Sequence, residues 1–329
     1  MTIEIKNPGL LTTIQDIGRY GYQKYGVIVS GAMDSLSLRI ANLLVGNDEH
    51  EATLEITLYG TTIKFNQDHL IAITGGNLQP TLDNEPIFMW RPIFVRKGSI
   101  LKFNGAKSGC RAYVSIAGGF LIPTQLGSKS TYLKAHIGGF KGRALKKGDT
   151  IKCGNRSDTA QTLIERMPNA KHYFPWSVIY HAWFSFYKTE TIRILKGSEY
   201  ERFDEASKQK LVNNPYTISP QADRMGYQLK GEKLCLTKHF ELLSEAVTYG
   251  TIQVPADGMP IILMADRQTT GGYPKIAQVI SADLPKLAQM QPHQKIIFKI
   301  VSQKKAEREL LIQEEKLKQL TIGIQTKVL

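Results

Sequence analysis

Residues 55–61 read Glu-Ile-Thr-Leu-Tyr-Gly-Thr, and residues 245–251 read Glu-Ala-Val-Thr-Tyr-Gly-Thr. The two stretches share their first residue and their last three, at an offset of 190 residues. Thr2–Ile5 (Thr-Ile-Glu-Ile) recurs at an offset of 189 as Thr191–Ile194 (Thr-Ile-Arg-Ile). Ordered matches at nearly one offset indicate an internal duplication, so the sequence predicts two copies of one fold.

The local pattern predicts that each copy is built from short strands. Thr62–Phe65, Ile100–Phe103 and Ile297–Ile300 alternate apolar residues with a lysine, which is typical of strands with one face buried. Gly-containing turns such as Gly75-Gly76 separate many such segments. Frequent short strands with turns between them favour a mainly β fold of barrels or sandwiches.

Helices are expected in three places. Residues 34–45 carry an apolar stripe, with Gly46 placed to end the helix. A second helix is expected at about 198–212, and a third at 303–320, packed through Leu310 and Leu317 on the second copy. The predicted organisation is a first β-barrel half at 1–156, an aromatic-rich bridge at 157–190, a second half at 191–302 and a C-terminal helix and tail at 303–329.

Composition excludes several classes of protein. The 329 residues are 42% hydrophobic and 22% charged, which is ordinary for globular domains. No apolar run is long enough to span a membrane, and the start has no signal-peptide pattern, so we expect a cytoplasmic protein. The three cysteines are widely separated in sequence and form neither a CxxC zinc half-site nor an even disulfide set, and no metal site is predicted. No phosphate-binding P-loop motif occurs either.

The strongest polar cluster, residues 265–273, reads Ala-Asp-Arg-Gln-Thr-Thr-Gly-Gly-Tyr and follows an apolar strand. Arg267 could bind a carboxylate or carbonyl oxygen with Asp266 orienting it, or the pair could clamp the two copies together. A second cluster, Gln221–Tyr227, contains Asp223 and Arg224. Its arginine could converge with Arg267 on one small anion, or the two could form independent surface ion pairs.

The formal net charge is +13. Between residues 129 and 147 the chain carries six basic residues and no acidic one, which indicates an anion-binding or partner-binding loop or simply a lysine-rich surface. The residues predicted for a partner interface are Lys129, Lys134, Phe140, Lys141 and Arg143. Nucleic-acid binding is rejected, because neither stacking aromatics nor a reading helix accompanies the charge.

Several ordered blocks together resemble one family. They are Pro8–Arg19 (Pro-Gly-Leu-Leu-Thr-Thr-Ile-Gln-Asp-Ile-Gly-Arg), Ser30–Asp34, Leu43–Asn47, Leu54–Thr57, Gly127–Leu133, Gly138–Phe140, Asp223–Tyr227, Ala265–Tyr273 and Ile280–Leu284. The chain is thereby identified as a member of the family that contains the C subunit of 5-oxoprolinase. This family includes KipA-type antagonists of a sensor-kinase inhibitor, allophanate hydrolase subunit 2-like proteins and the biotin-dependent carboxyltransferase part of urea carboxylase.

The resemblance implies two tandem cyclophilin-like β-barrels and an activity shared with partners. Three functions are compatible with it: the C subunit of an ATP-dependent 5-oxoprolinase acting with a KipI-like B subunit and an A subunit, the carboxyltransferase of an enzyme whose biotin is carried by a partner, or the regulator of a kinase inhibitor. It implies no intrinsic cofactor. The catalytic residues we predict are Asp266 and Arg267. We expect Arg267, Gln268, Thr270 and Tyr273 to hold the carboxylate and ring carbonyl, Arg224 and Tyr227 to line the same cleft, and Asp266 and Asp223 to fix the arginines.

Overall fold

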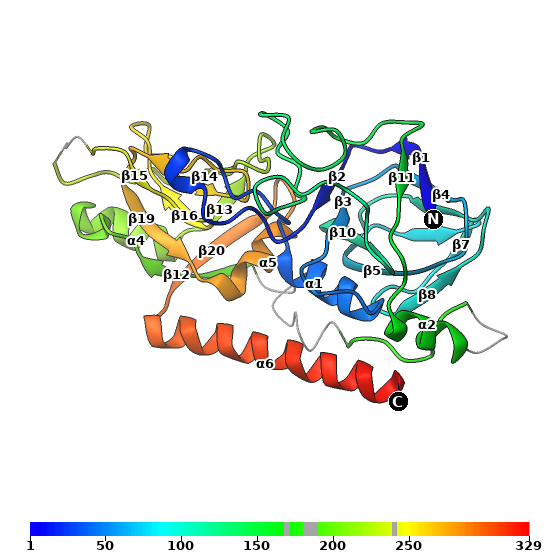
Figure 1. Ribbon diagram of the computed structural model, residues 1–329. Coiled ribbons are helices and arrows are strands. Elements are labelled where there is room, and N and C mark those ends of the chain that lie inside the picture. The colour runs from blue at the N-terminus through cyan, green and yellow to red at the C-terminus, as the bar shows by residue number, and fades with distance from the viewer. Residues whose placement is uncertain (168–171, 180–189, 239–241, 329) are drawn as a thin grey trace. The chain divides into compact units, whose positions relative to one another are not determined.

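The computed structural model describes residues 1–167, 172–179, 190–238 and 242–328 (Figure 1). Contacts between residues divide the chain into two compact units. Unit 1 comprises residues 1–19, 30–183 and 315–329, and unit 2 comprises residues 20–29 and 184–314. The domain limits predicted from the sequence remain predictions. They do not include two features of the division into units. The segment 20–29 belongs to unit 2, and the end of the chain belongs to unit 1.

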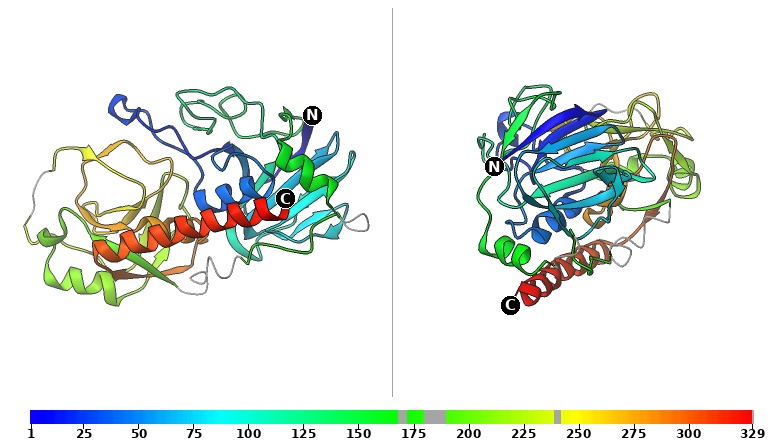
Figure 2. Two further views of the ribbon diagram at one scale, coloured as in Figure 1. Left: turned by 60° about the horizontal axis from the view of Figure 1, so that its bottom comes forward. Right: turned by 90° about the vertical axis from the view of Figure 1, so that its right-hand side faces the viewer.

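Unit 1 contains two antiparallel sheets that share one apolar core. The strand order is β11-β1-β4-β9-β6-β7 in one sheet and β2-β3-β10-β5-β8 in the other. The strands are β1 (Thr2–Pro8), β2 (Leu11–Gln15), β3 (Thr53–Thr57), β4 (Thr61–Phe65), β5 (His69–Asn77), β6 (Pro80–Leu82), β7 (Glu85–Pro86), β8 (Pro92–Val95), β9 (Ile100–Phe103), β10 (Ser108–Ile116) and β11 (Thr150–Lys152). The core takes side chains from both sheets, for example Ile3 and Phe65 from one and Leu54 and Val114 from the other. The right-hand view of Figure 2 shows blue and cyan strands of unit 1 lying side by side.

Among the described residues, the helices α1 and α2 accompany these sheets. The predicted helix at 34–45 is confirmed as α1 (Ser35–Leu44), which contacts β5 and β10. The Asp34 side chain caps it by accepting a hydrogen bond from the Ser37 backbone N–H at 2.9 Å, and Gly46 follows its end with a φ of +72°. The second helix, α2 (Asp158–Glu165), lies in the predicted bridge.

Unit 2 is a closed barrel with the strand order β12-β19-β16-β17-β14-β13-β20. Its strands are β12 (Thr191–Lys196), β13 (Tyr216–Ile218), β14 (Gly226–Lys230), β16 (Thr251–Gln253), β17 (Ile261–Leu263), β19 (Lys275–Val279) and β20 (Lys295–Ile300), and a separate ribbon pairs β15 (Glu245–Ala246) with β18 (Thr270–Gly271). Its short helices are η1 (Gln23–Tyr25), η3 (Tyr200–Arg202), α4 (Glu205–Asn213), η4 (Ser281–Asp283) and α5 (Leu284–Ala288). Mainly β architecture with few helices is confirmed, and closure into a barrel is confirmed for unit 2.

The repeated segments take different places in the two units. In unit 1, β1 and β9 both flank β4. In unit 2, β12, the repeat of β1, pairs directly and in parallel with β20, which has the same alternation of apolar residues with a lysine as β9, and Ile192 lies opposite Phe298. The repeat therefore marks strands in both units, while the pairing of those strands differs.

The second predicted helix, at 198–212, is interrupted. Phe203 has an extended backbone with φ −81° and ψ 148°, and the next residue, Asp204, caps α4 by accepting a 2.6 Å hydrogen bond from the Ser207 backbone N–H. A side chain that satisfies an N–H of the first turn starts a new helix at that point. The single helix was therefore a wrong prediction, because an internal Asp acted as a start signal.

The C-terminal helix α6 (Gln303–Val328) is longer than predicted. Leu317 is buried as expected, but Leu310 is 37% exposed. The residues from Glu315 onward cluster with unit 1, where the Arg166 side chain donates a 3.4 Å hydrogen bond to the Lys327 carbonyl (Figure 2). Docking of both leucines on the second barrel was therefore a wrong prediction.

Much of the predicted bridge, 168–171 and 180–189, lies outside the described residues. In the part between them, Tyr173 forms an isolated β-bridge with Ile93 of β8, and the Phe94 N–H donates a 2.7 Å hydrogen bond to the His172 carbonyl. This part of the bridge therefore extends the edge of a unit 1 sheet.

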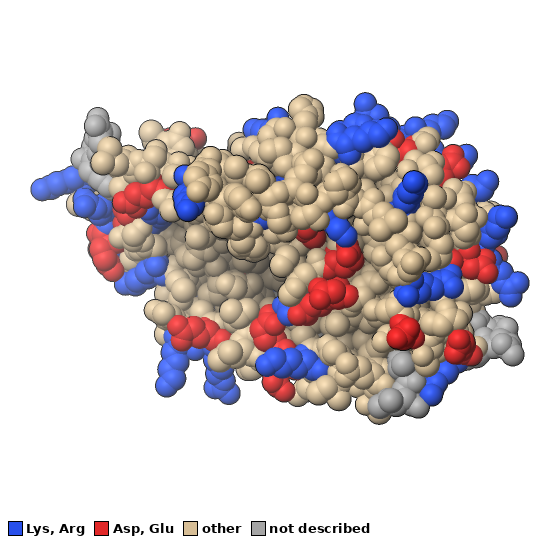
Figure 3. Space-filling model, viewed as in Figure 1, with Lys and Arg blue, Asp and Glu red and all other residues tan. Residues whose placement is uncertain are grey.

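On the one face that Figure 3 draws, the positive charge is not gathered into a single patch. On the face shown in Figure 3, lysine and arginine side chains alternate with acidic ones. No described helix is both long enough and apolar enough to cross a membrane. The net charge of +13 thus gives no single basic surface on this face.

Candidate functional site

The two predicted arginine clusters lie side by side in unit 2. Their strands pair antiparallel, with Gly226 of β14 opposite Leu263 of β17. Beyond the strands the pairing continues, because the Asp266 N–H donates to the Arg224 carbonyl at 2.7 Å. Two loops 42 residues apart in sequence are thus held together by backbone hydrogen bonds.

Arg224 and Asp266 form a buried, two-pronged ion pair. Nε and Nη2 of Arg224 donate to the two carboxylate oxygens of Asp266, each at 2.9 Å, and the exposed fractions of the side chains are 6% and 7%. Such parallel hydrogen bonds fix both groups in one orientation. Asp266 thus fixes an arginine, as predicted, but the guanidinium that its carboxylate binds is that of Arg224 and not that of the adjacent Arg267.

Asp223 and Tyr227 have structural surroundings. Asp223 is exposed, and its carboxylate accepts hydrogen bonds from the N–H groups of Met225 at 2.7 Å and Gly226 at 3.1 Å. This contact stabilises the turn into β14, so the prediction that Asp223 fixes an arginine was wrong. Tyr227 is 2% exposed, on the buried face of β14.

Arg267 is a buried cation whose partners are backbone carbonyls. It is 8% exposed, and its guanidinium lies 3.4 Å from the Val247 carbonyl oxygen and 3.5 Å from those of Met264 and Ala265. Within the described residues no Asp or Glu forms an ion pair with it. Burial lowers the pKa of Arg267, while Tyr20, Tyr249 and Asp266 oppose this shift. A charge with only long, neutral contacts is suited to receive an anion.

The remaining predicted residues follow Arg267 in the sequence and lie at the surface. Gln268 and Thr270 are exposed, and Tyr273 is 49% exposed. Thr270 belongs to the ribbon in which it pairs with Ala246, and the Tyr273 carbonyl accepts a 3.1 Å hydrogen bond from the Gln253 side chain. The ribbon and this bond hold the loop, while its side chains face solvent.

Lys275 was missed by the sequence reasoning. It is 9% exposed, and its ammonium forms ion pairs with Glu245 and, at 3.8 Å, with Glu199. Glu245 is the first residue of the repeated stretch, which was the one available signal. Lys275 therefore ties the ribbon to the barrel wall next to the candidate loop.

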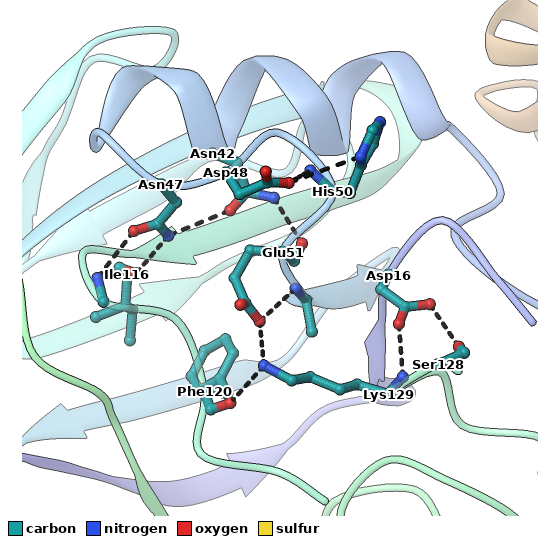
Figure 4. Close-up of polar contacts among 12 residues, drawn as sticks. Asp16, Asn42, Asn47, Asp48, His50, Glu51, Ile116, Phe120, Ser128 and Lys129 are labelled. Carbon is teal, nitrogen blue, oxygen red and sulfur yellow. Dashed lines mark hydrogen bonds and ion pairs between the residues drawn. The ribbon is translucent and has the colours of Figure 1, made fainter. Parts of the chain in front are cut away.

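The predicted partner loop of unit 1 begins with a rigid, internally bonded segment. The Asp16 carboxylate accepts hydrogen bonds from the Ser128 hydroxyl at 2.7 Å, the Lys129 N–H at 2.5 Å and the Ser130 hydroxyl at 2.5 Å. The Lys129 ammonium reaches Glu51 at 2.6 Å and the Phe120 carbonyl at 3.3 Å (Figure 4). Lys129 is therefore a structural contact within unit 1.

The rest of that loop is mixed. Arg143 is paired with Asp149 through two 2.7 Å hydrogen bonds, which raise the pKa of Arg143 and lower that of Asp149. Phe140 is half-buried against the core, and Lys134 and Lys141 are exposed. The loop lines a pocket of about 310 Å³ that includes Phe140 and Lys141. Of the five residues predicted for a partner interface, Lys134 and Lys141 are the two that are exposed at the surface.

A buried polar network in unit 1 was not predicted. The Tyr113 hydroxyl donates to Glu55 at 2.8 Å and accepts from the Asp34 N–H at 2.8 Å, and the Met33 N–H donates to Glu55 at 2.8 Å. Burial, with the charges of Glu55 and Asp34, raises the pKa of Tyr113 well above its usual value. The network fixes the segment before α1.

The described residues contain no group of three or more His, Cys, Asp or Glu side chains placed to hold a metal ion. Cys110 and Cys153 are buried and Cys235 is exposed, all as free thiols. The chemistry that the buried guanidinium of Arg267 offers is recognition of an anion.

Comparison with known proteins shows the family. Residues 25–300 match the family described as carboxyltransferase domain, subdomain A and B, and the chain belongs to it. It is 41% identical over 304 residues to the C subunit of 5-oxoprolinase from Haemophilus influenzae, covering 92% of this chain and 93% of that protein. It is 39% identical over 297 residues to the C subunit of 5-oxoprolinase from Escherichia coli, covering 90% of each.

A solved structure agrees with this. The crystal structure of the Kluyveromyces lactis urea carboxylase superposes with a TM-score of 0.85 and 29% identity, over 97% of this chain. This chain corresponds to only 29% of that longer protein. The carboxyltransferase fold is thus shared between proteins whose names describe different reactions.

Proposed function

We propose that this protein is the C subunit of an ATP-dependent 5-oxoprolinase in the cytoplasm, active only together with an A subunit and a KipI-like B subunit. The observation that carries the proposal is end-to-end similarity: both 5-oxoprolinase proteins match over at least 90% of their own length. The urea carboxylase instead contains this fold as less than a third of its chain.

The chemistry required is ring opening of a cyclic amide that carries a carboxylate. Phosphoryl transfer from ATP to the amide oxygen releases ADP and activates the carbonyl carbon. Water attacks that carbon, and the C–N bond breaks as the nitrogen takes up a proton. A second water then hydrolyses the resulting acyl phosphate to the carboxylate and free phosphate. Such a reaction needs cations that hold the carboxylate and the developing oxyanion. Arg267 supports this role, because it is buried and its described partners are neutral carbonyl groups.

In this proposal the ion pair of Arg224 and Asp266 positions the loop, and the residues that touch substrate are Arg267, Gln268, Thr270 and Tyr273. Arg224 acts indirectly, since both of its hydrogen bonds to Asp266 already use its guanidinium edge. ATP is used by the complex and this chain contributes no cofactor of its own. Exposed Lys134 and Lys141 contact a partner protein of the complex.

The test is reconstitution. Purified protein is mixed with the two partner proteins, and ATP-dependent conversion of 5-oxoproline to glutamate is measured with each component omitted in turn. Arg267→Met should lower kcat/KM at least about tenfold, from the loss of a charge-assisted hydrogen bond, and Arg267→Lys less. Lys295→Met is the matched control, because it removes one positive charge from an exposed position of the same unit. Full activity of Arg267→Met would reject the site, and turnover without the two partner proteins would reject the required complex.

A second function, carboxyltransferase of a biotin-dependent carboxylase, is favoured by the description of the matched family and by the superposition on urea carboxylase. Here a partner would carry the biotin. The test adds a biotin carboxylase, a biotinylated carrier, bicarbonate, ATP and urea, and measures carboxylated urea. Product that depends on this chain would support the second function, and its absence alongside active 5-oxoproline turnover would exclude it.

A further inference from the structure

Unit 1 contains a pocket of about 270 Å³ that the candidate site does not use. Its lining includes Phe88, Trp90 and Arg91, from the segment between β7 and β8, together with Asn77 and Ser108. The pocket opens where β5 and β10 change register, since Ser108 pairs with Asn77 but the next pair is Ala112 with Gly75. A bulge interrupts a sheet locally and leaves room beside the strands.

Arg91 provides a positive charge in this pocket. Its Nη1 donates a 3.0 Å hydrogen bond to the Phe174 carbonyl, and its guanidinium carbon lies 5.0 Å from the Phe88 ring centre and 5.4 Å from that of Tyr173. The two rings meet edge to face, with centroids 5.4 Å apart. Aromatic rings on its faces hold the guanidinium in place while leaving its edge available for hydrogen bonds.

The charge of Arg91 has no acidic counterpart in the described part of the chain, where no Asp or Glu pairs with it. Its Nε is buried without a hydrogen bond there. Burial accordingly lowers the pKa of Arg91. A partly desolvated cation in a pocket gains most from an anion that supplies the missing acceptors.

The walls define what else the ligand contains. Trp90, Met89 and Ile87 give apolar surface, and Asn77, Ser108 and Ser177 give neutral polar side chains. Trp90 is fixed by two backbone hydrogen bonds of 2.8 Å, from its own N–H to the Ile73 carbonyl and from the Val178 N–H to its carbonyl. The apolar wall is therefore preformed.

We propose that this pocket binds a small organic carboxylate that carries an amide or hydroxyl group and a flat apolar part. The carboxylate pairs with Arg91, the polar group contacts Asn77, Ser108 or Ser177, and the apolar part packs on Trp90. This site lies in unit 1 and does not depend on the proposed 5-oxoprolinase function, whose substrate residues lie in unit 2.

The experiment titrates the full chain, without partner proteins, with benzoylglycine and follows tryptophan fluorescence. Unit 2 contains no tryptophan in its sequence, so the signal arises from unit 1. Benzoylglycinamide, which has the same shape without the negative charge, is the matched probe. We expect saturable binding of benzoylglycine in the millimolar range or tighter, and binding of the amide about tenfold weaker or more.

Arg91→Met should bring benzoylglycine binding down to that of the amide, and Arg91→Lys should keep part of the difference. Arg267→Met, which removes the buried cation of unit 2, should leave the titration unchanged. Equal binding of the two probes by the wild-type chain, or no saturable binding of benzoylglycine, would overturn the proposal. That comparison uses only wild-type protein, so it stands even where Arg91→Met fails to fold.

Discussion

His69 should make unit 1 less stable as the pH falls below neutral. It begins β5, is fully buried, and its ring lies 5.6 Å from that of Phe65. Burial lowers the pKa of His69 from 6.5 to about 4, and the charge of Arg156 acts in the same direction while the Thr2 backbone opposes it. The folded state therefore holds the ring neutral where the unfolded chain would protonate it.

The sign and size follow from proton linkage. Above pH 6.5 the ring is neutral in both states and costs nothing. As the pH falls, protons bind first to the unfolded chain and favour it. The lowering of the His69 pKa from 6.5 to about 4 corresponds to a loss of roughly 3 kcal/mol in the free energy of unfolding once the ring is protonated in both states. At pH 5 this loss is about 2 kcal/mol.

The assay is urea unfolding at pH 7, 6 and 5, followed by tryptophan fluorescence, which reports unit 1. His69→Leu removes the titrating group and keeps an apolar side chain of similar size. Between pH 7 and 5 the wild-type free energy of unfolding should fall by about 2 kcal/mol more than that of His69→Leu. His136→Leu, at an exposed position, should behave like wild type. Parallel curves for wild type and His69→Leu would refute the reasoning.

Three further outcomes are expected. Asp266→Asn removes the carboxylate charge that pairs with the buried Arg224 guanidinium, so stability measured by far-UV circular dichroism during urea unfolding should fall by about 3–5 kcal/mol, and Arg224→Met with Asp266→Leu should recover part of this. Gly138→Ala would press a methyl group into a backbone carbonyl oxygen, whereas Gly127→Ala meets nothing within 4 Å, so the melting temperature should drop clearly more for Gly138→Ala. Lys134→Glu, at an exposed position, should weaken binding of the KipI-like partner in a salt-dependent way without changing the melting temperature, and unchanged affinity would remove it from the interface.

Strand positions were predictable because they depend on local alternation. The alternation of apolar residues predicted strands at Thr62–Phe65 and Ile100–Phe103, and the structure has β4 and β9 there. Strand partners were not, because pairing depends on contacts distant in sequence, and the counterparts β1 and β12 have different neighbours. A repeat in sequence therefore indicated two β units but not their topology.

The candidate site shows the same limit. That two arginine loops meet could be anticipated from their matching Asp-Arg pairs, but which carboxylate binds which guanidinium could not. Asp266 is adjacent to Arg267 in sequence and binds Arg224, 42 residues away. Asp266 lies in a turn in which the Arg267 N–H donates to the Met264 carbonyl at 3.2 Å, so adjacency in sequence did not decide which guanidinium its carboxylate meets.

The excursion of residues 20–29 has a consequence for biosynthesis. The chain contributes these ten residues to unit 2 and then builds unit 1 from 30 to 183 before the rest of unit 2 begins. At roughly 5–20 residues per second, a ribosome needs on the order of 8–30 s for that interval. During this time residues 20–29, which include the exposed Tyr20 and Tyr25, have no barrel strands of unit 2 to pack against. Unit 2 can therefore be completed only after residues 184–314 have been synthesised, and a fragment beginning at 184 would lack residues 20–29 of this unit.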